Sequence, residues 1–141
     1  MTTSPEGALV AAACAAAAGD AGVRAVLGDP ARIYDDRPEH AAFPYATIAR
    51  VVSRASERNA PRTLETTITL HVSSRWGART EALDVVNALR DALHGAALDV
   101  EGRRLVLLYA SYADVVRAED RVTALGVLDL HAVTEPAGET P

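Results

Sequence analysis

The sequence contains few of the residues on which disulfide scaffolds, nucleic-acid binders and many enzymes depend. Cys14 is the only cysteine among the 141 residues, so a disulfide framework cannot form. Lysine is absent, all 14 basic residues are arginine, and 19 acidic residues give a formal net charge of −5. Phosphate binding needs a basic surface, and the acidic balance therefore argues against a binder of nucleic acid or of an anionic membrane.

Aromatic residues are also scarce, at 4% of the chain, and alanine supplies much of its 49% apolar content. A chain of this length still buries roughly two-thirds of the surface that its unfolded form exposes, so it folds without a disulfide or a metal. We predict one domain over residues 1–135. Residues 136–141 carry two prolines and a glycine, and we predict a flexible C-terminal tail there.

Known patterns of catalytic or metal-binding residues are missing. The sequence has no glycine-rich phosphate loop, nucleophile elbow or metalloprotease signature. The four histidines lack the close spacing of a helical metal site, and one cysteine cannot extend such a site. We therefore predict no enzyme activity, no cofactor and no metal.

An apolar run near the N-terminus is similar to the apolar core of a signal peptide. It covers residues 8–18, but no arginine precedes Arg24, so the basic region of a signal peptide is missing. The run is also too short to span a bilayer. We expect cytoplasmic synthesis, with Cys14 as a small buried apolar residue.

Periodicity predicts the main elements. Ser4 is a candidate N-cap, with Pro5 at the first helical position and Gly19 at the end of a helix over residues 5–18. Residues 64–73 alternate apolar and polar side chains, which is typical of an antiparallel strand with one buried face. Residues 78–94 repeat apolar positions at spacings of three and four, which predicts an amphipathic helix.

The remaining segments complete the predicted fold. Further strands are expected at residues 32–34, 45–53, 105–112 and 122–133, and a short one at 97–100, with loops at 54–62 and 114–121. The order of elements predicts an α+β fold. We expect an antiparallel sheet of about four to five strands with two helices packed on one face.

Eight residues are candidates for a partner interface. The polar loop at 54–62 is long for a compact domain, Trp76 lies between a strand and a helix, and two histidines lie on polar strand faces. A solvated loop, a core tryptophan and solvated histidines are the alternatives. His94, at a helix end, is expected to serve the helix dipole. The candidates are Arg54, Glu57, Arg58, Asn59, Arg62, Trp76, His71 and His131.

The order of several short motifs resembles a known family. Arg-Ile-Tyr-Asp at 32–35 is followed by Phe-Pro-Tyr-Ala-Thr-Ile at 43–48, by Leu-His-Val-Ser-Ser-Arg at 70–75, and by Gly-Val-Leu at 126–128. In this order they resemble the phage tail-completion family, formerly catalogued as a domain of unknown function. The resemblance covers roughly residues 5–135. Members occur in tailed phages, in prophages and in alphaproteobacterial gene transfer agents.

This resemblance implies a structural role in a phage-like particle. Tail terminators of the family form a ring, usually a hexamer, at the head-proximal end of the tail tube. The ring stops tube polymerisation and joins the tube to the head-side stopper or connector protein, and DNA passes through its lumen without specific binding. The implied location is the virion, after assembly in the bacterial cytoplasm, with no membrane involved.

Two alternatives remain open. The first alternative, within the same class, is a head–tail stopper or another minor tail protein. The second, from a different class, is a small-molecule-binding α+β domain or an enzyme, which requires a pocket with converging polar groups.

Overall fold

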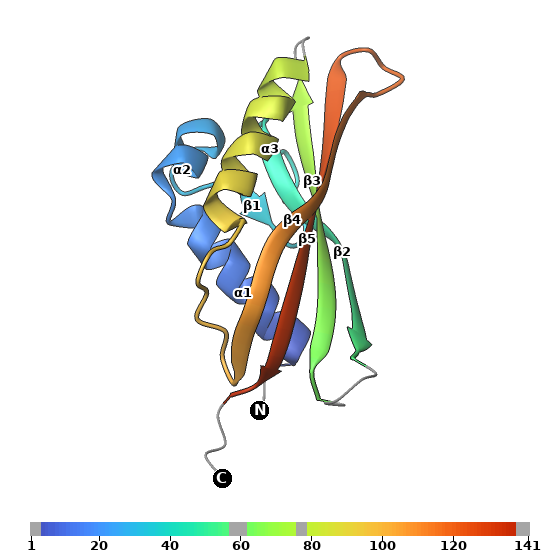
Figure 1. The fold of residues 1–141 in the computed structure, drawn as a ribbon. Helices are drawn as coiled ribbons and strands as arrows, with labels where there is room; N and C mark the ends of the chain where they lie inside the picture. The colour runs from blue at the N-terminus through green and yellow to red at the C-terminus, as the bar shows by residue number, and fades with distance from the viewer. Residues whose placement is uncertain (1–3, 57–61, 76–78, 138–141) are drawn as a thin grey trace.

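The computed structural model describes residues 4–56, 62–75 and 79–137. The strands form one five-stranded sheet in the order β1-β2-β3-β5-β4, and the helices gather on one of its faces (Figure 1). The predicted α+β class, with a mostly antiparallel sheet, is confirmed. Along the chain the elements are α1 (Pro5–Ala18), α2 (Ala21–Leu27), β1 (Ile33–Tyr34), β2 (Tyr45–Ala55), β3 (Leu64–Arg75), α3 (Arg79–Leu93), β4 (Arg103–Arg117) and β5 (Thr123–Pro136).

Helix α1 begins and ends where its capping residues predict. The Ser4 hydroxyl accepts a hydrogen bond from the Gly7 amide at 2.9 Å, Pro5 occupies the first turn, and the Gly19 amide donates to the Ala15 carbonyl. Its buried positions are almost all alanine, so the helix approaches the rest of the core closely. None of the described helices has by itself the length and apolar content of a membrane span; only the sharply bent pair α1 and α2, taken together, reaches them.

The structure adds a third helix to the two that were expected. Asp20 caps α2 by accepting a hydrogen bond from the Val23 amide at 3.0 Å. Val23 and Leu27 are fully buried, so this short helix is held by tertiary packing. The sequence gives little indication of this helix, because glycines flank it and it spans only seven residues.

The core lies between α3 and the inner face of the sheet. Strand β3 buries alternate residues from Thr66 to Ser74, and β5 does the same from Ala124 to Thr134. Val85, Leu89 and Leu93 of α3 lie over them, and burying each contributes about 1.5–3 kcal/mol. The predicted alternation and the amphipathic helix are therefore confirmed.

Two predictions about the second half of the chain are wrong. Residues 114–117 belong to β4, because Asp114 and Arg117 pair with Val127 and Ala124 of β5, and this pairing overrides their polar local sequence. Residues 97–100 form no strand; they connect α3 to β4, and Val100 contributes its side chain to the core. The predicted loop at 54–62 also starts later, because β2 continues through Ala55.

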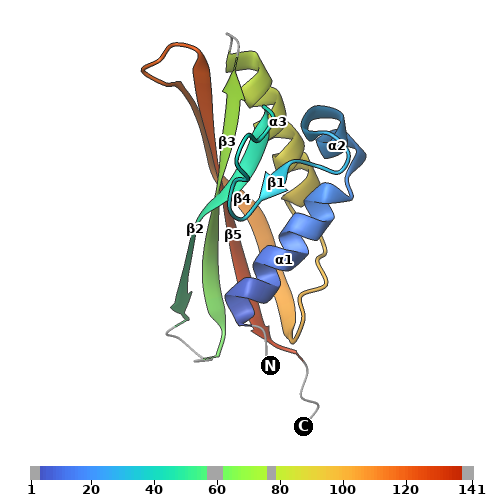
Figure 2. The same ribbon diagram turned by 180° about the vertical axis from the view of Figure 1, so that it is seen from behind.

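The topology leaves one face of the sheet without helices. The connection through α3 places β5 between β3 and β4, so strands distant in sequence lie side by side. Figures 1 and 2 show the sheet nearly edge-on from opposite sides, with the helices always on the same face. Of the predicted tail, Pro136 ends β5 and the Ala137 amide donates to the Gly102 carbonyl, while residues 138–141 lie outside the described part.

Candidate functional site

The face of the sheet that carries no helix is polar along its centre. On β3 this face presents Glu65, Thr67, Thr69 and His71, all half-buried between neighbouring strands. On β5 it presents Asp129 and His131 in the same way. Polar side chains that pair across neighbouring strands in this way stabilise a sheet surface.

His131 is the most connected of these groups. Its Nδ1 lies 3.4 Å from the Thr67 hydroxyl, and its Nε2 lies 3.7 Å from a Glu65 carboxylate oxygen. The Tyr109 ring packs against the imidazole with centroids 5.3 Å apart. Two residues further along β3, the Thr69 hydroxyl donates to Asp129 at 2.6 Å. The predicted interface residue His131 thus belongs to a ladder that runs across β3, β5 and β4.

The second candidate histidine lies elsewhere on this face. His71 is opposite Thr47 on one side and Val127 on the other, whereas His131 is opposite Thr67. Four residues of β3 separate the two rows, which is roughly 13 Å at about 3.3 Å per residue. The two histidines therefore do not form a pair.

Two other candidates, Arg54 and Arg62, lie near the start of β3, at one end of the sheet. Arg54 is exposed on β2, opposite Glu65 of β3. Arg62 is exposed, and its carbonyl accepts a hydrogen bond from Arg103 at 2.8 Å. The remaining candidates, Glu57, Arg58, Asn59 and Trp76, lie outside the described residues.

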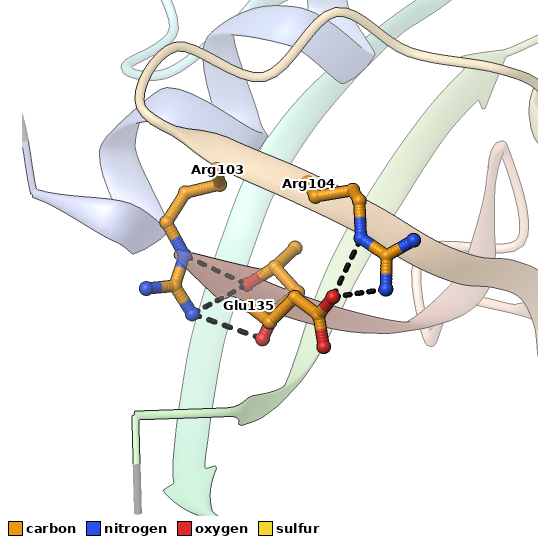
Figure 3. Close-up of polar contacts among 4 residues, drawn as sticks. Arg103, Arg104 and Glu135 are labelled. Carbon is orange, nitrogen blue, oxygen red and sulfur yellow. Dashed lines mark hydrogen bonds and ion pairs between the residues drawn. The ribbon is translucent and has the colours of Figure 1, made fainter. Parts of the chain in front are cut away.

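Two arginines at the start of β4 tie this strand to the end of β5. The Arg103 guanidinium donates to the Thr134 carbonyl at 2.9 Å and reaches the Thr134 hydroxyl as well. Arg104 forms an ion pair with Glu135 (Figure 3). Both contacts cross the same strand boundary, so they fix the register of the β4–β5 hairpin at its open end.

Strand β4 carries an exposed apolar surface that contains none of the eight candidate interface residues. It consists of Val106, Leu107, Tyr109, Tyr112 and Val116, each 41–53% exposed. Contiguous exposed apolar residues mark interaction surfaces more often than free surface. The apolar run at 105–109 is the signal that could have identified this surface. Tyr112 donates to Asp114 at 3.2 Å, and this hydrogen bond raises the pKa of Tyr112.

The C-terminus of α3 covers part of the outer edge of β4. The Gly95 amide donates to the Leu108 carbonyl at 2.9 Å, and His94 Nδ1 accepts from the Ala110 amide at 3.1 Å. His94 therefore binds a strand amide, and the role expected for it at the helix dipole is replaced by this contact. The acceptor role places the imidazole proton on Nε2.

The tip of the β4–β5 hairpin is organised by one carboxylate. Asp120 accepts hydrogen bonds from the amides of Val122 and Thr123, at 2.9 and 2.8 Å, and from the Thr123 hydroxyl. The bond from the Thr123 amide is the main cause that lowers the pKa of Asp120. Asp120 therefore closes the turn through its own hydrogen bonds.

We expect Asp120→Ala to loosen this turn without unfolding the sheet. Two backbone amides lose their acceptor, so hydrogen exchange at Val122 and Thr123 should accelerate while exchange in β3 stays unchanged. Because the pKa is lowered, the stabilisation is complete above the ordinary value of 3.8 and is lost as pH falls through the lowered pKa. Glu119→Ala is the matched control. Equal exchange rates at Val122 in both variants would contradict the role of Asp120.

Metal binding and a reactive cysteine are two further possibilities for the described part of the chain. No three His, Cys, Asp or Glu residues gather there in a way that could hold a metal ion. Cys14 is half-buried in a groove between α1 and β2, and burial, followed by the charge of Asp35, raises the pKa of its thiol. The thiol form is thereby favoured over the reactive thiolate.

Comparisons with known proteins agree with one another. A family profile described as "Tail completion protein gp17" matches residues 11–135. A chain from a solved structure titled "Virion of native gene transfer agent (GTA) particle" superposes with a TM-score of 0.83 at 25% identity, covering 95% of this chain and 99% of the other. No curated protein sequence matches the chain.

Proposed function

Because this chain belongs to the family of tail completion proteins, we propose that it is the tail terminator of a phage-like particle. Family membership and the likeness to a gene transfer agent virion chain make it a tail protein of such a particle. In the proposed terminator role, copies of the chain form a ring, hexameric as is usual in the family, at the head-proximal end of the tail tube.

The observation that carries this proposal is the extent of the structural likeness. It includes nearly all of both chains, so the similarity concerns the entire particle component and not a shared substructure. The partners in this role are other copies of the chain, the tail tube protein and a head-side stopper or connector protein. The ring caps the tube, stops its polymerisation and joins it to the head side.

The charge of the chain suits a channel through which DNA passes. With a net charge of −5, the subunit as a whole repels phosphate, so a genome can slide without sticking. The uncovered face of the sheet carries Glu65, Asp114 and Asp129 together with Arg50 and Arg54, so acidic and basic groups are mixed there and the repulsion comes from the net charge of the chain. DNA passage of this kind needs no specific nucleic-acid site.

Deleting the gene in its particle-producing host tests the proposal. We expect overlong tail tubes that stay detached from heads in electron micrographs of the particles, and we expect the gene supplied in trans to restore both length and joining. Tails of normal length attached to heads would contradict the terminator role. Tails of normal length beside detached heads that have lost their DNA would instead indicate a head–tail stopper.

A further inference from the structure

The sheet has two strand edges that remain partly open. On β4, His94 and Gly95 cover the edge as far as Ala110, which leaves the segment from residue 111 to 117. On β2, strand β1 pairs only with Ala46 and Thr47, which leaves the segment from 49 to 55. Open strand edges of this length pair readily with another chain.

Hydrogen bonds at the strand ends show which backbone groups point away from the sheet. The Ala118 amide donates to the Thr123 carbonyl and so points toward β5. By alternation, the backbone N–H and C=O groups of Ala113 and Val115 point away from β5, toward the open edge of β4. The Ser56 amide donates to the Thr63 carbonyl and so points toward β3. By alternation, the backbone N–H and C=O groups of Val51 and Ser53 point away from β3, toward the open edge of β2. Each edge thus presents a short row of backbone donors and acceptors.

We propose that β4 of one copy pairs with β2 of the next copy, antiparallel, with Ala113 opposite Val51. This contact rests on the proposed ring. Strand β4 is antiparallel to β5, β5 to β3 and β3 to β2, so β4 and β2 point in opposite directions within one subunit. A neighbour related by rotation therefore presents its β2 antiparallel to β4.

Side-chain charges favour this register. With Ala113 opposite Val51, Arg50 of one copy lies opposite Asp114 of the other, on the face of the sheet that carries no helix. Strand β2 contains two arginines and no acid, and among the described residues neither Arg50 nor Arg54 has an ion pair. The same register places Val52 against Tyr112, which is 53% exposed in the single chain.

The contact can close into a ring. Within one subunit, Ala113 pairs with Leu128 of β5, which pairs with Leu70 of β3. Val51 of β2 pairs with Ile68, two residues away from Leu70 on β3. Each new copy is thus displaced by two residues along the strands, roughly 7 Å. Strands tilted to the ring axis absorb this displacement, as they do in a closed barrel. The contact joins two different patches, which is what a cyclic assembly needs.

Disulfide trapping in assembled particles tests this pairing. In a Cys14→Ala background, Val52→Cys and Tyr112→Cys place cysteines at a non-hydrogen-bonded pair, about 4.5 Å apart between Cα atoms. This lies within the range that a disulfide spans. Particles from the complemented deletion strain are oxidised and run on non-reducing gels. We expect the double variant to form a ladder of covalent oligomers that ends at the size of the ring.

The controls separate this pairing from other contacts. Each single cysteine variant should stay monomeric, and so should Thr67→Cys with Tyr112→Cys, because β3 lies inside the sheet. Covalent dimers from Tyr112→Cys alone would overturn the proposal in favour of a contact between two β4 strands. Particles with normal tails and no ladder would overturn it while leaving the terminator role intact.

A charge exchange gives a second test that does not depend on cysteine geometry. Arg50→Asp alone and Asp114→Arg alone should each reduce the number of tailed particles that complementation restores. Combining them in one chain rebuilds an ion pair of reversed polarity, so particle numbers should recover. Circular dichroism of the purified variants checks that each one folds. A combined variant that is worse than either single variant would overturn the predicted register.

Discussion

Replacing Leu89 by alanine is expected to lower the free energy of unfolding by about 2–5 kcal/mol. Leu89 lies on the buried side of α3 and is fully buried, among the side chains that close the core against the sheet. The core is short of large side chains because alanine supplies much of the apolar content, so few neighbours can move into the space left behind. Chemical denaturation followed by circular dichroism measures the change.

Leu83→Ala on the same helix is the matched control. Leu83 is 52% exposed, so the same substitution removes the same atoms without opening a cavity. We expect a change within about 0.5 kcal/mol, the range of ordinary surface substitutions. A loss at Leu83 as large as the loss at Leu89 would contradict the placement of α3 and show that the opposite side of the helix is buried.

Gly126→Ala is expected to destabilise the fold by about 1–3 kcal/mol through overpacking. A Cβ at this position would lie 2.8 Å from Val86 Cγ2 and 3.2 Å from Val72 Cβ, so the Val86 side chain, or α3 with it, would have to shift. The glycine lets the helix approach the strand closely, and this requirement comes from packing and not from a positive φ angle.

Val86→Ala should partly rescue Gly126→Ala. Alone, Val86→Ala removes two buried methyl groups at roughly 0.8 kcal/mol each. In the double variant the lost Cγ2 makes room for the new methyl group, so the combined cost should fall below the sum of the two single costs. Val72 still limits the space, so the rescue is incomplete. Combining Gly126→Ala with Leu83→Ala should instead be additive, because Leu83 is on the exposed side of α3.

The elements that the sequence predicts well are those whose signals are local. Ser4 caps α1 through a hydrogen bond to a residue three positions away. An apolar period of two predicts strand β3, and an apolar period of three to four predicts helix α3, because each element buries one face against the same core. The motifs around Tyr45, His71 and Gly126 also led to the family that the comparisons support.

Contacts between distant residues could not be predicted in this way. His131 meets Thr67 only because β5 inserts between β3 and β4, a pairing that joins residues 64 positions apart. The polar residues 114–117 became strand because β5 supplied hydrogen-bond partners that their own sequence does not indicate. His94 found an amide of β4 where the helix-end pattern suggested only its own helix.

The sequence by itself determined the class of the fold, the main helices, the strand with one buried face, and the family. These depend on local periodicity, on capping and on the order of short motifs. The tertiary structure decided which strands are neighbours, which edges stay open and which side chains meet on the uncovered face. Strand order depends on contacts between residues far apart in the chain, and the period of a single strand carries no information about its partner.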